Sequence, residues 1–183
     1  MAEPRDGLRL FFALWPGEAQ RRALAEVRDG VASTGGRPVP DEQLHLTVLF
    51  VGEQERRAVE AAGEQASTLV APFEMRLEEL GFFARLGRLS RSGVVWVGSR
   101  GVPQPLRQLN EGLQRRLRRL GVGFDGKRLR PHVTLRRKAG APPQRELDEP
   151  IRWPVEELAL VGSRLSRQGA SYEVLQRWPL GGG

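Results

Sequence analysis

The chain of 183 residues contains no cysteine and only two histidines. Without cysteine it has no disulfide bond, no thiolate metal site and no cysteine nucleophile. Neither histidine has a second histidine or an acidic residue at the close spacing of a zincin-type zinc motif. We therefore expect chemistry that needs neither a metal ion nor another cofactor.

Long hydrophobic runs are also missing. No apolar stretch approaches the roughly 18–20 residues that a membrane-spanning helix needs. The first residues, Met1–Asp6, lack the basic and then apolar layout of a signal peptide. The composition, with 39% hydrophobic and 28% charged residues, is typical of a globular protein that buries a core. We expect a cytoplasmic monomer of one domain, spanning residues 1–183, without membrane contact.

Positive charge is abundant, and lysine contributes almost none of it. The formal net charge is +7, and the 29 basic residues include only two lysines. This excess favours an anionic partner such as RNA, although a general bias toward arginine in the source proteome gives the same excess. The arginines of the Arg115–Arg119 cluster are expected on a solvated helix face. Four further arginines are expected to flank a cleft and attract an RNA end: Arg85, Arg88, Arg91 and Arg100.

Hydrophobic periodicity predicts an alternation of strands and helices. Strands are expected at residues 8–15, 43–52, 72–83, 94–98, 131–138, 155–165 and 171–178, and helices at residues 18–32, 53–70 and 103–120. Glycine and prolines between residues 139 and 150 indicate a surface loop there. The order strand, helix, strand occurs twice, which predicts two related halves.

Both histidines open the same four-residue pattern. Residues 45–48 read His-Leu-Thr-Val, and residues 132–135 read His-Val-Thr-Leu, about half the chain apart. In a strand, residues two apart share a face, so each histidine lies beside its threonine while the apolar residues point into a core. Two such strands brought together place two imidazoles and two hydroxyls around one polar cavity.

This equipment is suited to acid–base chemistry on a phosphate. Histidine has an unperturbed pKa of about 6.5, so one neutral ring can take a proton from water while an imidazolium gives one to a leaving oxygen. Threonine hydroxyls can donate hydrogen bonds to the phosphate oxygens that gain charge. A lone histidine on a strand is more often structural. A chain that uses both of its histidines in one repeated pattern favours catalysis.

The two patterns, together with further segments of the chain, resemble those of a known protein family. The chain is similar to the 2H phosphoesterase superfamily, in the branch of RNA 2′,3′-cyclic phosphodiesterases, also called 2′-5′ RNA ligases. The segments that carry the resemblance are residues 9–14, 43–53, 72–73, 81–83, 94–98, 130–137, 163–165, 169, 172–174 and 178–180.

The resemblance implies an α+β fold: a bilobal, pseudo-two-fold arrangement in which two antiparallel sheets line a central cleft and helices pack outside. It also implies metal-independent opening of a 2′,3′-cyclic phosphate at an RNA end, leaving a 2′-phosphate. His45 would then protonate the departing O3′, and His132 would activate water. Thr47 and Thr134 match the threonines that grip the phosphate.

Two further pairs of residues leave alternatives open. Arg137 matches a phosphate-contacting arginine of the family, but its odd offset from His132 requires a bulge or a strand end between them. Arg136, at an even offset, fits the alternation better. Phe11 and Phe12 are adjacent, so one of them faces the cleft and is a candidate for stacking on a base. Packing in the core is the alternative for either ring.

Several functions therefore stay open. Hydrolysis of RNA 2′,3′-cyclic phosphate ends is favoured, and 2′-5′ ligation uses the same residues in reverse. A small cyclic nucleotide or a cyclic phosphate of ADP-ribose is another candidate substrate. A non-catalytic RNA-binding module is the alternative outside enzymes. Trp96 and Trp153 are expected in the core or on a sheet face, and Tyr172 is given no catalytic role.

Overall fold

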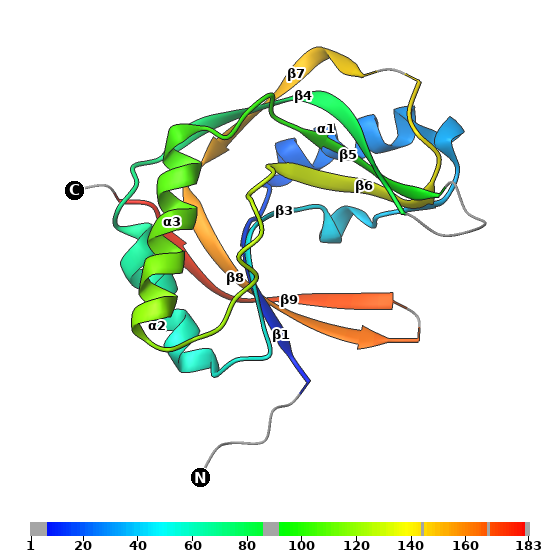
Figure 1. The fold of residues 1–183 in the computed structure, drawn as a ribbon. Helices are drawn as coiled ribbons and strands as arrows, with labels where there is room; N and C mark the ends of the chain where they lie inside the picture. Colours follow the sequence, from blue (N-terminus) through cyan, green and yellow to red (C-terminus); the bar gives the residue numbers. More distant parts are fainter. Residues whose placement is uncertain (1–6, 86–91, 144, 168, 182–183) are drawn as a thin grey trace.

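The computed structural model describes residues 7–85, 92–143, 145–167 and 169–181 (Figure 1). Arg88 and Arg91, two of the arginines expected beside the cleft, lie outside these ranges. Within the described ranges, no helix combines the length and apolar character needed to cross a membrane.

The elements follow the predicted order, with two strands that the sequence pattern missed. The strands are β1 (Arg9–Leu14), β2 (Arg37–Pro38), β3 (Leu46–Gly52), β4 (Phe73–Ala84), β5 (Gly93–Gly98), β6 (His132–Ala139), β7 (Glu146–Val155), β8 (Glu157–Ser166) and β9 (Gly169–Pro179). The helices are α1 (Glu18–Gly30), α2 (Arg56–Ser67) and α3 (Gln104–Arg119), with 3-10 turns at Ala32–Thr34 and Asp41–Gln43.

The missed strands are the two-residue β2 and the longer β7, and the surface loop expected for residues 139–150 is wrong in its second part. Pro150, with the glycine and prolines before it, argued against a strand, because proline cannot donate a ladder hydrogen bond. However, β7 is the outermost strand of its end of the sheet and pairs with β4, where Pro154 lies opposite Glu74. An edge strand needs donors toward one neighbour only, so it tolerates these prolines. Trp153 of β7 is buried, as expected.

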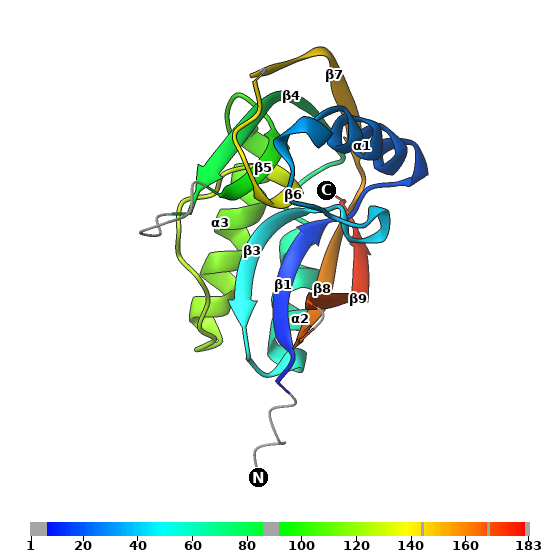
Figure 2. The same cartoon turned by 90° about the vertical axis from the view of Figure 1, so that its right-hand side faces the viewer.

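The fold is α+β, and the main strands pair antiparallel in the order β7-β4-β5-β6-β3-β1-β8-β9. Two groups of four strands meet where β6 lies beside β3. The junction is a single residue pair, Leu46 with Val133. Figure 2 shows β3 and β1 side by side, with β6 next to β3. Both histidine motifs therefore lie at the centre of the molecule, where the two groups meet.

Each helix that precedes a motif packs on the opposite group of strands. α1 connects β1 to β3 but packs on β6 and β7. α3 connects β5 to β6 but packs on β3, beside α2, which covers β8 and β9 (Figure 1). Because the helices cross over, the two groups of strands are held together by more than the single pair at the junction.

The two faces of β1 have different surroundings: one packs in the core, and the other lies on the open face of the sheet. Leu10, Phe12 and Leu14 belong to the main core between the sheet and the helices. Phe11 and Ala13, which alternate with them, belong to a small apolar cluster on the other face. The face that carries Phe11 is the one on which the histidines are found.

Candidate active site

The pairing of β3 with β6 brings the two motifs together. Leu46 and Val133 are paired and fully buried, so they fix the inward face of both strands. Continuing this antiparallel register by one residue on each side places His45 across from Thr134 and Thr47 across from His132. The four polar side chains share the outward face. The arrangement is thus crosswise, with each histidine beside the other motif's threonine.

The two imidazoles are anchored in the same way. Nδ1 of His45 lies 2.6 Å from the carbonyl oxygen of Gln43, and Nδ1 of His132 lies 2.6 Å from that of Arg130. A carbonyl only accepts, so each Nδ1 carries the proton. In the neutral ring Nε2 is then unprotonated. Each ring has its Nε2 ready to take or return a proton.

Aromatic rings enclose both histidines. Trp15 stacks on His45 with a centroid distance of 5.2 Å and an angle of 8°, and Phe11 and Tyr172 each lie 5.1 Å from the same ring. These contacts give Tyr172 a place in the site that the sequence pattern did not assign to it. The rings exclude water from around one side of His45.

His132 has a smaller enclosure. Phe83 meets its ring edge-on at 5.0 Å, and Trp96 lies 6.0 Å away. Trp96 fits only because its strand neighbours are glycines: a Cβ on Gly81 would come within 1.9 Å of the indole, and one on Gly98 within 3.0 Å. Trp96 therefore lies on the sheet face, as expected, and its ring packs beside His132.

Burial makes both imidazoles hard to protonate. It lowers the pKa of His45 from 6.5 to about 4; the Gln43 carbonyl opposes this change, and the charges of Arg137 and His132 add to it. Burial also lowers the pKa of His132, and the charges of Arg137 and Arg130 lower it further. Both rings are therefore neutral at pH 7. An anion bound between them raises both pKa values, because it favours the charged form of each ring.

Comparison with known proteins identifies the family. Residues 15–167 match the model of the 2′-5′ RNA ligase superfamily. The chain belongs to this superfamily. An RNA 2′,3′-cyclic phosphodiesterase of Thermus thermophilus is 37% identical, over 96% of this chain and 91% of that protein. One of Escherichia coli is 34% identical, over 98% of this chain and 99% of that protein. The solved structure of the Thermus thermophilus protein TT0787 superimposes with a TM-score of 0.80 at 36% identity, covering 95% of this chain and 98% of that chain.

In this member of the superfamily, a bulge in β6 decides where Arg137 points. Val95 and Trp96 of β5 pair with Arg136 and Thr134, so Leu135 has no partner on β5. Leu135 and Arg136 are both buried, and the alternation resumes with Arg137 exposed on the histidine side. The charge of Arg137 acts on both histidines. The bulge that the odd offset required is present.

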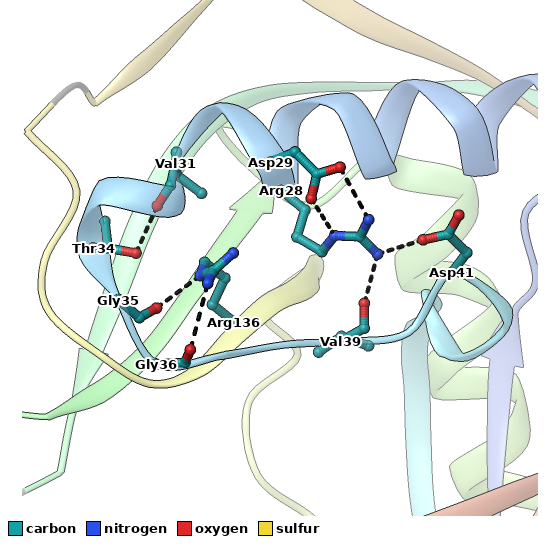
Figure 3. Close-up of polar contacts among 9 residues, drawn as sticks. All are labelled: Arg28, Asp29, Val31, Thr34, Gly35, Gly36, Val39, Asp41 and Arg136. Atoms are coloured by element: carbon teal, nitrogen blue, oxygen red, sulfur yellow. Dashed lines mark hydrogen bonds and ion pairs between the residues drawn. The ribbon is translucent and has the colours of Figure 1, made fainter.

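Arg136 points away from the site. Its Nε donates to the Gly35 carbonyl at 2.7 Å, and Nη2 donates to the Gly36 carbonyl at 3.4 Å (Figure 3). Gly36 has a φ of +71°, and a Cβ there would come within 2.4 Å of the Arg137 carbonyl oxygen. The guanidinium of Arg136 is used to hold the chain that precedes the first motif, which favours Arg137 over Arg136 as the phosphate ligand.

The same chain segment is held at a second point. Arg28 donates to the carbonyl of Val39 at 2.7 Å and forms ion pairs with Asp29 and Asp41 (Figure 3). Asp41 opens the short turn that leads to His45. The approach to the first histidine is thus fixed by one arginine from α1 and one from β6.

The two phenylalanines of β1 have different surroundings. Phe12 is fully buried and packs on Trp178 in the core, so it is withdrawn as a candidate for stacking on a base. Phe11 faces the site but is only 3% exposed, between His45, Tyr172 and Phe50. Phe50, which is 36% exposed, offers a more accessible ring. Sequence reasoning missed Phe50, although it lies three residues after Thr47.

Two adjoining hollows open beside His132. The smaller, of about 260 Å³, is lined by Thr47, Phe50, Asp125 and Lys127 among others. The larger, of about 490 Å³, extends past Trp96 and Ser99. Five residues line both: Phe83, Arg128, Leu129, Arg130 and His132.

The remaining sequence candidates lie elsewhere. Arg100 is ion-paired with Glu146 at 2.7 Å, so its charge is partly compensated. Arg115 is exposed on α3 and lies near Glu111, as expected for a solvated face. Among the residues that the structure places, no group of three or more His, Asp or Glu side chains is arranged to hold a metal ion.

Proposed function

We propose that this protein hydrolyses 2′,3′-cyclic phosphates at RNA ends to 2′-phosphates. The observation that carries the proposal is the pair of identically anchored imidazoles that meet across the junction of β3 and β6. The name RNA 2′,3′-cyclic phosphodiesterase of the Thermus thermophilus and Escherichia coli relatives supports the substrate. We further propose that the protein acts as a monomer in the cytoplasm.

The proposed reaction uses Nε2 of each ring. His132 takes a proton from water, and the water oxygen attacks phosphorus. The bond from phosphorus to O3′ breaks, and O3′ takes a proton from His45. His45 must therefore enter as imidazolium, which the negative charge of the bound phosphate favours by raising its pKa. Thr47, Thr134 and Arg137 stabilise the charge on the non-bridging oxygens.

Single substitutions test the pair. His45→Ala and His132→Ala are each expected to lower kcat on an RNA ending in a 2′,3′-cyclic phosphate by about 10²–10⁴-fold, because each removes one proton transfer. Thr68→Ala, which removes an exposed hydroxyl at the end of α2, serves as the control. Chromatography of the product should show a 2′-phosphate. Full activity in either histidine variant contradicts the two-histidine mechanism.

A modified substrate tests which histidine is the acid. When the bridging 3′-oxygen is replaced by sulfur, the leaving thiolate needs little protonation, since a thiol has a pKa of about 8.5. This substrate is expected to restore much of the activity of His45→Ala and little of that of His132→Ala. If the sulfur substrate restores the activity of His132→Ala instead, then His132 is the acid and His45 is the base.

The other activities are separated by the same assay. Ligation is the reverse reaction and needs the same residues, so it appears as joining of a 5′-hydroxyl RNA to the cyclic end. A binding module has no need of two imidazoles with free Nε2 atoms. Binding of the RNA without any product would support the module.

A further inference from the structure

The two histidines are anchored alike, but only His132 adjoins the larger hollow. Its lining includes Arg107, Arg128 and Arg130, together with Ser99 and the rings of Phe83 and Trp96. No acidic residue of the described chain lines it, whereas the smaller hollow contains Asp125. The larger hollow is therefore the more positive of the two. Its volume of about 490 Å³ is within the range of about 300–1,000 Å³ that is usual for ligand sites.

Some exposed arginines of the protein pair with acids, as Arg22 does with Glu18 and Arg152 does with Glu74. The three arginines of this hollow are not among them. Within the described ranges, Arg107, Arg128 and Arg130 have no acidic partner. Arg107 makes only a 3.5 Å bond to the Val102 carbonyl, and Arg130 lies over the ring of Phe83 at 5.9 Å. All three are exposed.

The chain that carries Arg128 and Arg130 is held in place against β3. Beyond Leu46, no strand of the described ranges pairs with this edge of β3. Asn110 of α3 donates to the Val48 carbonyl at 2.8 Å, and the backbone N–H of Asp125 donates to the Phe50 carbonyl at 2.8 Å. The segment after α3 is thereby fixed along the edge of β3 and leads directly to His132.

We propose that the larger hollow binds the nucleotide on the 5′ side of the terminal one, so that the enzyme selects polynucleotides over cyclic mononucleotides. This inference rests on the proposed function. The cyclic phosphate lies against His132, and the next phosphate of the chain enters the hollow, where Arg107 and Arg128 bind it. Phe83 offers its ring to the adjoining base. Such contacts neutralise phosphate charge without reading sequence.

The test compares two substrates in one enzyme. Cytidine 2′,3′-cyclic phosphate occupies only the reacting position, whereas a trinucleotide ending in the same group also reaches the hollow. The kcat/KM of the trinucleotide is expected to exceed that of the mononucleotide by about tenfold or more. A factor of this size corresponds to one hydrogen bond to a charged group. In Arg107→Gln/Arg128→Gln the ratio should fall toward one. Arg115→Gln, on the outer face of α3, should keep the wild-type ratio.

Salt dependence gives a second readout. For a single strand, the slope of log(kcat/KM) against log[salt] changes by about 0.7 for each phosphate contact. The trinucleotide should therefore show a steeper slope than the mononucleotide in the wild type, and a shallower slope in the double variant. Single Arg107→Gln gives the intermediate value if the double variant does not fold.

The outcomes separate this inference from the proposed function. A wild-type ratio near one, or a ratio that the double variant leaves unaltered, overturns the hollow as a subsite while hydrolysis itself stands. The same loss in Arg115→Gln also overturns it, because net charge would then be the cause. Absence of hydrolysis of both substrates by the wild type overturns the proposed function instead.

Discussion

His45 and His132 have the same backbone anchor and different surroundings. Each Nδ1 donates to the carbonyl two residues before it, so the tautomer is set locally by the residues that lead into each strand. His45 is then enclosed by Trp15, Phe11 and Tyr172. At the residue scale, the two histidines share one backbone hydrogen bond but differ in the side chains around them. Different surroundings can give two chemically identical groups different pKa values.

The lowered pKa of His45 makes stability depend on pH. The unfolded chain takes up this proton near pH 6.5, but the folded protein does so only near pH 4. Between these values the unfolded state binds more protons, so the free energy of unfolding is expected to decrease as the pH falls from 6.5 to 4. Above pH 6.5 this contribution is absent.

Urea unfolding at several pH values measures this effect. His45→Asn should give a shallower decrease of the free energy of unfolding than the wild type over the acidic range. His132 is expected to contribute in the same direction, since burial also lowers its pKa. Equal slopes for His45→Asn and the wild type would contradict the prediction.

At the scale of elements, the bulge at Leu135 connects the two motifs. It turns Arg136 toward the Gly35 and Gly36 carbonyls and leaves Arg137 beside the histidines. Arg37 also pairs with Arg137, so β2 and β6 are joined at the same place. One irregular residue thereby positions both Arg137 and the approach to His45.

Arg136→Met should disturb the site without touching substrate. The variant keeps a long apolar side chain but leaves the Gly35 and Gly36 carbonyls without their donor. We expect kcat/KM to fall by up to about 100-fold, since small misplacements of catalytic groups have effects of this size. Arg136→Lys, which retains one donor, should recover part of the activity. An unaltered kcat/KM in Arg136→Met would show that the bulge holds Arg137 without this anchor.

Asn110 has a corresponding role for the edge of β3. It is 6% exposed and donates to the Val48 carbonyl, which none of the described strands reaches. Asn110→Ala leaves this carbonyl unsatisfied and should lower the free energy of unfolding by about 1–3 kcal/mol. Thermal or urea unfolding measures the change. Gln108→Ala, at an exposed position of α3, should change stability by less than about 0.5 kcal/mol. Equal effects of the two variants would contradict the assignment.

At the scale of the whole molecule, the site belongs to neither group of strands alone. β3 contributes one motif and β6 the other, and they meet through one residue pair. Helices α1 and α3 each cross to the group that holds the other motif. We propose that the chain is one domain of two related halves, one carrying His45 and the other His132, and that the site forms only when both are folded.

A site in which two imidazoles perform both proton transfers should be independent of added metal. Dialysis against EDTA is expected to leave kcat/KM on a cyclic-phosphate RNA within about twofold of the untreated protein, because the proposed steps assign both proton transfers to His45 and His132. A loss of activity that a divalent ion restores would instead point to metal-assisted chemistry.

Local patterns determined much of the fold. Apolar periodicity located α1, α2, α3 and the motif strands, since each buries a regular stripe or face. β7 was not predicted, because Pro150 and the prolines before it indicated a loop. A strand tolerates proline at an edge position, and an edge position is a property of the whole sheet. The adjacency of Phe11 and Phe12 predicted that they face opposite ways, but only packing placed Phe12 against Trp178.

By itself, the sequence determined which groups are available for chemistry: two histidines and two threonines, with each pair on one face of its strand, because side-chain alternation is a local property of the backbone. Tertiary structure alone decided the rest. The pairing of Leu46 with Val133 sets His45 across from Thr134, and the bulge at Leu135 moves Arg137 to the same side. Register and bulges depend on how distant strands pack, so no short stretch of sequence specifies them.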